Sequence, residues 1–213
     1  MRGVAGLVCI VGVLGLQAQS KLEPHFSLQG SLGLPVALSN PVFETLTEVQ
    51  GQFDLCAQMP LVDGLGFGAG VKGSWFSLEE RSLSQTPTSG DVQRLAFYAK
   101  VQLERYIGGR TYYEVNGKVG SSTWDWNCRT CTDNLRQTDL HWSLGGGLFL
   151  HATDNLAFGL TAAYEADAAS FGPEVIGLNE FPGRTERGGP YRFFVVGLAF
   201  STRFLPTASE GMW

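Results

Sequence analysis

Apolar and polar residues alternate along most of this chain, and turn-forming residues separate the alternating runs. Alternation at a period of two is typical of a β-strand with two unlike faces. Helical periodicity is nearly absent. The pattern predicts eight strands, at about His25–Val36, Glu48–Met59, Gly64–Ser77, Gln93–Glu104, Thr111–Thr123, Asp139–His151, Asn155–Glu165 and Tyr191–Phe204.

The connections between these strands alternate in length. The short ones read PLVD, RYIGGR and ATD, whereas the long ones include LEERSLSQTPTSGD and the stretch from Ala166 to Pro190. Short turns on one side and longer loops on the other are the layout of an outer-membrane barrel. The sequence therefore predicts an all-β fold: an eight-stranded antiparallel up-and-down transmembrane β-barrel with short periplasmic turns and long extracellular loops.

The two faces of the strands differ in a way that assigns inside and outside. One face carries leucine, valine and aromatic residues with almost no charge, and would be far too apolar for a water-exposed surface. The other mixes glycine and serine with ions, as a crowded eight-stranded interior requires. We expect the apolar face to meet lipid and the other to form a paired interior network of Glu48, Asp54, Lys72, Arg94, Lys100, Glu104, Glu114, Lys118 and Glu165. A proton or ion path along these residues is the alternative.

The N-terminal segment has the three parts of a secretory signal. MRG is positively charged, VAGLVCIVGVLGL is an apolar run too short for a stable membrane helix, and QAQS follows. We expect cleavage after Ala18, which gives a signal peptide at 1–18, a barrel at 19–204 and a short tail at 205–213. The net charge of −5 and the lack of a basic block indicate no nucleic-acid partner.

With this signal, these strands and these loops, the chain resembles the small eight-stranded outer-membrane barrels of Gram-negative bacteria, the class of the OmpA and OmpX transmembrane domains. In that class a glycine, spaced aromatics and a terminal aromatic on the last strand are read by the barrel-assembly machinery. Gly197, Phe200 and Phe204 look like that signal, although the tail LPTASEGMW departs from the usual aromatic end. The resemblance implies a monomer in the outer membrane, surrounded by lipid and lipopolysaccharide.

Two groups of residues are candidates for a chemical role. Cys128 and Cys131 form a CxxC pair in a long loop, and we expect a local disulfide there rather than a zinc half-site or a redox pair, because no second ligand pair and no helix N-terminus is evident. His141 and Ser143 share a strand face, which raises a lipid hydrolase. They lie on the polar interior face, so we predict no catalytic, cofactor or metal site.

The long loops are the remaining candidates for function. Trp124, Trp126, Phe171 and Phe181 are loop aromatics that could contact an unknown extracellular partner, although for Trp124 and Trp126 packing within the core of the loop is an equal alternative. The sequence thus predicts a non-enzymatic outer-membrane barrel with a filled, non-porin interior that contacts partners or ligands through its loops. The alternatives are a lipid-modifying enzyme, a small-solute conduit and a soluble secreted ligand-binding barrel.

Overall fold

The computed structural model describes residues 26–78, 90–128, 135–176, 181 and 188–204. The expected signal peptide and C-terminal tail lie outside these ranges. The strands are β1 (Ser27–Ala37), β2 (Thr47–Val62), β3 (Leu65–Leu78), β4 (Gly90–Tyr106), β5 (Thr111–Cys128), β6 (Leu135–His151), β7 (Leu156–Phe171) and β8 (Gly189–Arg203). A short helix, α1 (Pro41–Leu46), follows β1, and a 3-10 turn, η2 (Pro173–Ile176), follows β7.

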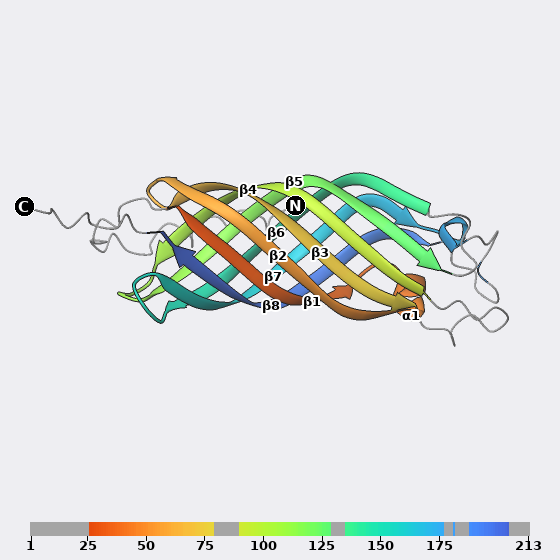
Figure 1. Cartoon of the computed structure of the whole chain (residues 1–213), viewed down its shortest axis with the longest axis horizontal. Helices are drawn as coiled ribbons and strands as arrows, with labels where there is room; N and C mark the ends of the chain where they lie inside the picture. The colour runs from red at the N-terminus through yellow and green to blue at the C-terminus, as the bar shows by residue number, and fades with distance from the viewer. Residues whose placement is uncertain (1–25, 79–89, 129–134, 177–180, 182–187, 205–213) are drawn as a thin grey trace, which may run out of the picture.

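All eight strands pair with their neighbours in sequence order, and β1 pairs with β8 to close the barrel (Figure 1). Every pairing is antiparallel, including the closing one, in which Leu32 lies opposite Leu198 and Gly33 opposite Gly197. Closure leaves no open edge through the body of the barrel, which is the condition for placing strands in lipid. The predicted eight-stranded antiparallel barrel is confirmed.

The three short connections and the strand termini at Ser27 and Arg203 share one end of the barrel, the short-turn end, at the left of Figure 1. The β2–β3 hairpin turns through Asp63 and Gly64, with φ of 47° and 82°. An Asp-Gly pair in this conformation matches the right-handed twist of the flanking strands. A side chain at Gly64 would collide with the Glu104 carbonyl oxygen, so glycine is required there.

The opposite end, the long-loop end, carries α1 (Figure 1). Asn40 caps this helix: its side chain accepts from the Phe43 N–H at 3.0 Å and donates to the Gly189 carbonyl at 2.9 Å. Pro41 follows at the first helical position, where its missing N–H costs nothing. The cap therefore ties α1 to the start of β8. In the described residues, neither helical segment has the length and apolarity needed to cross a membrane.

Several strands run further toward the long-loop end than the alternation predicted. β4 begins at Gly90, β5 continues to Cys128 and β7 continues to Phe171. The stretch from Ala166, expected to be the longest loop, therefore begins as strand. Its small residues hide the extension, and the pairing of β7 with β8 is irregular between Ala166 and Ser170, which interrupts the simple alternation.

Candidate functional site

Side chains divide between the barrel's two faces as the sequence indicates. Leu144 and Leu160 point outward and are 61% and 63% exposed. Lys72 and Lys100 point inward and are each 1% exposed. A wide apolar belt thus faces outward while ions are enclosed, which is the arrangement of a membrane barrel and the reverse of a soluble one.

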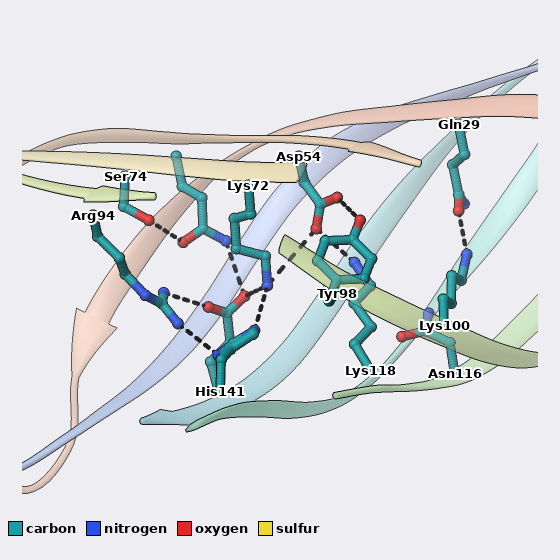
Figure 2. Close-up of polar contacts among 12 residues, drawn as sticks. Gln29, Asp54, Lys72, Ser74, Arg94, Tyr98, Lys100, Asn116, Lys118 and His141 are labelled. Carbon is teal, nitrogen blue, oxygen red and sulfur yellow. Dashed lines mark hydrogen bonds and ion pairs between the residues drawn. The ribbon is translucent and has the colours of Figure 1, made fainter. Parts of the chain in front are cut away.

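The charged interior is centred on Glu165, which extends from β7 (Figure 2 shows its partners). Its two carboxylate oxygens accept from Lys72 Nζ at 2.7 Å and from Arg94 Nη1 at 2.8 Å. Gln52 Nε2 donates to the same carboxylate at 2.9 Å. Buried charges are tolerated when each is paired and hydrogen-bonded, as here.

Arg94 joins Glu165 to a second acid, Asp167. The Arg94 Nε lies 2.9 Å from one Asp167 oxygen, and His141 Nδ1 lies 2.8 Å from the other. Trp124 donates its indole N–H to Asp167 at 2.8 Å. Four side chains from strands β4, β5, β6 and β7 therefore lock together across the long-loop half of the interior.

Two further groups lie toward the short-turn end (Figure 2). Asp54 pairs with Lys118 at 2.5 Å, lies 3.7 Å from Lys72 and accepts from the Tyr98 hydroxyl. Lys100 pairs with Glu114 at 2.8 Å and donates to Gln58 at 2.8 Å. Lys72 links the first of these groups to the Glu165 cluster, so the network is continuous across several strands.

The short-turn end of the interior is closed by rings and one more ion pair. Arg203 pairs with Glu104 at 2.6 Å and its guanidinium lies over the rings of Tyr106 and Tyr112. The Tyr112 ring stacks on Phe149 with centroids 4.9 Å apart. Tyr112 and Phe149 are fully buried, so this layer closes the polar interior at the short-turn end.

An aromatic cap seals the long-loop end. Phe43 of α1 inserts between rings from four strands and makes an edge-to-face contact with each of Phe76, Trp124, Trp126, Phe171, Tyr191 and Phe193. Val42 and Leu46 of the same helix are buried beside it. Edge-to-face contacts add to the free energy of burying the rings. The helix thus closes the long-loop end of the barrel.

Between the two closures, the described strands enclose a small polar space. A cavity of about 50 Å³ lies against the small-residue wall of β6 and β7, and Gln29, Asp54, Asn116 and Lys118 contribute to its lining. One water needs about 10–15 Å³ of such space. The cavity therefore has room for a few water molecules beside the ion pairs.

The structure brings together the predicted network with one exception, Glu48. Asp54, Lys72, Arg94, Lys100, Glu104, Glu114, Lys118 and Glu165 all face the interior and have ionic partners. Glu48 is exposed. The pairing of β2 with β3 shifts between Val49 and Gly51, and this bulge reverses which residues face inward upstream of it.

The four loop aromatics require a larger correction. Trp124, Trp126, Phe171 and Phe181 are all at least 97% buried and belong to the aromatic cap. They were expected on loops because the strands were predicted to end too early. In the longer strands, Trp124, Trp126 and Phe171 continue the inward row. Their side chains do not stand on the surface where a partner would meet them.

The remaining predicted residues lie at the surface or near the rim. Cys128 ends β5, whereas Cys131 is outside the described residues. On β8, Gly197 lies opposite Gly33, Phe200 covers Gly30 on the outer face, and Phe204 is exposed. Recognition of the last strand by the barrel-assembly machinery stays a prediction.

The side chains that a lipid hydrolase would need are only partly arranged for catalysis. His141 has its acid, Asp167, but among the described residues the Ser143 hydroxyl has no hydrogen-bond partner, and both side chains are enclosed. A nucleophile needs its base within hydrogen-bond reach and its substrate alongside. In the described part of the chain, no group of three or more His, Cys, Asp or Glu side chains is placed to hold a metal.

Sequence reasoning missed Asp167, Tyr98 as a partner of Asp54, and Phe43. Asp167 could have been found, because it continues the inward row two residues after Glu165. Tyr98 was on the correct face but was not recognised as a hydrogen-bond donor to the network. No sequence pattern indicates that Phe43 packs inside the barrel, because nothing in ALSNPVFETLT fixes where a loop helix packs.

Comparison with known proteins finds similarity in structure only. No family model matches the chain, and no curated protein gives a significant match. Neisserial surface protein A superposes with a TM-score of 0.56 and 10% identity over 86% of this chain and all of that protein. A major outer-membrane protein of Thermus thermophilus gives 0.55 and 13%, over 86% and 100%. OprG of Pseudomonas aeruginosa gives 0.54 and 11%, over 86% and 97%. The chain therefore has the fold of the small eight-stranded outer-membrane β-barrels.

Proposed function

We propose that the protein is a non-enzymatic outer-membrane barrel whose interior is permanently filled, and that it acts through contacts at its long-loop end. The signal peptide pattern, the apolar outer belt and the outer-membrane origin of the structural neighbours support this location. The long-loop end would then face the cell exterior, because that is where outer-membrane barrels carry their longer connections.

One observation carries the proposal: the interior is blocked by three successive layers. The aromatic cap on Phe43, the ion-pair network on Glu165 and the ring layer on Tyr112 follow one another along the barrel. An ion or solute would have to separate buried charge pairs in order to pass, and breaking such a pair costs about 3–5 kcal/mol. A continuous conduit is therefore not supported.

The same burial argues against the lipid-modifying alternative. Ser143 and His141 are shut inside the ion-pair layer, whereas a lipid hydrolase must open its nucleophile to the membrane. What is left for contact with other molecules is the rim above the membrane. The proposed activity is partner binding at that rim, with the filled barrel as a rigid support.

Location and closure can be tested on one preparation. The detergent-extracted membrane fraction should contain the protein, and its gel migration should change on boiling, as folded outer-membrane barrels do. In planar bilayers the folded protein should give no conductance steps above the background of protein-free detergent. Recovery in the aqueous supernatant would refute the membrane location, and steady single-channel steps would refute the filled interior.

A further inference from the structure

At the long-loop end, the described strands leave the barrel wall incomplete between β6 and β7, as they also do between β1 and β2, whose pairing stops at Gly33↔Gln52. Pairing of β6 with β7 runs from His151↔Ala157 only as far as His141↔Asp167. Beyond this point β6 continues to Leu135, paired on its other side with β5 as far as Trp126. Residues 136–140 of β6 therefore form a strand edge, called here the free edge.

The free edge arises because β7 leaves the wall to build the aromatic cap. Beyond Ala166 the pairing of β7 with β8 becomes irregular, and Phe171 stacks on Trp126 with centroids 4.9 Å apart. Val175 and Ile176 of η2 are buried in the same cap. Beyond Asp167 this segment no longer pairs with β6, and the Gln137 side chain reaches it by donating to the Ser170 carbonyl at 3.3 Å.

The backbone groups that face the gap can be identified from the register. His151 donates its N–H to Arg110, on the β5 side, and the pairing of β5 with β6 has no irregularity. Successive residues of a strand direct their N–H and C=O groups to opposite neighbours. Odd-numbered residues of β6 therefore face β5, and Arg136, Thr138 and Leu140 face the gap.

The hydrogen bond of Leu140 agrees with this assignment. Its N–H is taken by the exposed carboxylate of Asp139, at 2.8 Å, instead of by a neighbouring strand. In the described ranges, no backbone group pairs with Arg136 or Thr138 on the side of β6 that faces the gap. Unpaired edges are the sites at which sheets accept another strand, so proteins usually cover or blunt them.

We propose that the free edge of β6 is a docking site for an extended peptide segment of a partner protein, which adds to the barrel wall as a further strand. This inference rests on the proposed function, since it names the surface and the kind of partner at the long-loop end. Main-chain hydrogen bonds to Arg136 and Thr138 supply the attraction in this mode of recognition. A docked strand would take over the Leu140 N–H from the Asp139 carboxylate. The freed carboxylate then favours a peptide with a lysine or arginine opposite it.

A second copy of the chain fits this edge poorly. Two barrels in one membrane have the same up–down orientation. Because barrel strands tilt by about 35–45° from the membrane normal, a two-fold axis along that normal would make the two β6 strands cross at a large angle, which prevents them from pairing along their length. An independent peptide has no such constraint and can run antiparallel to β6.

Hydrogen exchange tests the free edge itself. In the folded protein in detergent micelles, the amide of Thr138 should exchange far faster than those of Gln137 and Asp139, which face β5. Protection of Thr138 equal to that of its neighbours would overturn the assignment of the edge. This measurement is independent of conductance, so it can fail while the filled interior stands, and the reverse also holds.

Docking is tested with a fluorescent peptide of about ten residues that alternates threonine and valine and ends in lysines. We expect saturable binding to the wild-type protein and to Thr138→Val, and a loss of at least about tenfold in affinity for Thr138→Pro. The N–H that proline removes faces the gap, and valine controls for the lost hydroxyl contact with Thr123. Heat-modifiable migration verifies that each variant is folded.

A second variant keeps the test decisive if proline disturbs the strand. Asp139→Lys should reverse the charge preference, so that a matching peptide with glutamate ends binds more tightly than the lysine-ended one. Equal binding to wild type and Thr138→Pro, or no saturable binding to wild type, would overturn the proposal. A wild-type dimer that Thr138→Pro separates, without peptide binding, would replace the peptide by a second copy as the occupant and would equally overturn it.

Discussion

Replacing Glu165 by glutamine should reveal how strongly the interior depends on balanced charge. Glutamine keeps the size of the side chain but removes the charge that Lys72 and Arg94 share at 2.7 and 2.8 Å. Leaving buried charge without its partner typically costs about 3–5 kcal/mol. Because Arg94 keeps Asp167 at 2.9 Å and Lys72 keeps Asp54 at 3.7 Å, we expect Glu165→Gln to lower the free energy of unfolding by about 3 kcal/mol.

A double-mutant cycle with Lys72, the ion-pair partner of Glu165, gives a sharper test. Lys72→Met alone leaves excess negative charge, whereas Glu165→Gln combined with Lys72→Met removes one charge of each sign. The double variant should therefore be more stable than the sum of the single effects predicts, by a coupling free energy of about 1–3 kcal/mol. Glu48→Gln, at the exposed position before the bulge, serves as the control and should change stability by less than about 0.5 kcal/mol.

Urea unfolding of the protein refolded in phospholipid vesicles, followed by tryptophan fluorescence, gives the required free energies from the midpoint and slope. Wild-type stability for Glu165→Gln would refute the idea that the pairs are energetically coupled to folding. Strict additivity in the double variant would refute the assignment of Lys72 as the partner. Either result would mean that water in the interior cavity screens these charges more than their burial indicates.

Four further results are expected. Phe43→Ala should destabilise the barrel by about 3–5 kcal/mol and shift tryptophan emission to the red, because the cap loses its central ring; bilayer recordings should stay silent, and conductance would show that the cap alone blocks the interior. Leu160→Arg should cost about 2–4 kcal/mol in a bilayer, since it would place a charge in the outward apolar belt; an unchanged urea midpoint would contradict lipid contact there. Phe204→Ala should lower the amount of folded protein in cellular outer membranes without changing the urea midpoint of purified protein, and normal cellular levels would remove Phe204 from the assembly signal. Cys128 and Cys131 should form a disulfide, so reduction should add the mass of two hydrogens to the intact mature chain, and a pair that reacts fully with maleimide before reduction would exclude it.

Conductance and stability address different properties of the same residues. If Glu165→Gln destabilises the barrel yet remains silent in bilayers, the network stabilises the fold and the two ring layers suffice for closure. If the variant conducts, the charged layer is itself the barrier. Both outcomes are informative because the three layers are centred on different side chains, Phe43, Glu165 and Tyr112.

The alternation of the sequence determined the strands, their order and the face on which most side chains lie. Residues such as Lys72, Lys100 and Glu114 were assigned to the interior correctly because a strand fixes which way each side chain points once one face is known. The contrast between an apolar row and a row of glycine and ions was enough to place the apolar row outside. These are local properties, and the printed sequence contains them.

Only the tertiary structure decided how the ends of the barrel close. The bulge that turns Glu48 outward depends on how β2 pairs with β3, and the burial of Trp124 depends on rings that come from other strands. The place of Phe43 depends on a cavity that exists only after eight strands have closed. Such contacts join residues far apart in the chain, so no periodicity records them.

The free edge of β6 illustrates the same division. The sequence predicts a strand that begins near Asp139, and nothing in it indicates that β6 extends to Arg136 and Thr138 without a described partner on its β7 side. The cap likewise depends on the folded barrel, since Phe171 at the end of β7 packs its ring against Trp126 and Phe43 from other parts of the chain. Burial of such a ring removes a large apolar surface from water, and this contribution exists only once the strands have come together.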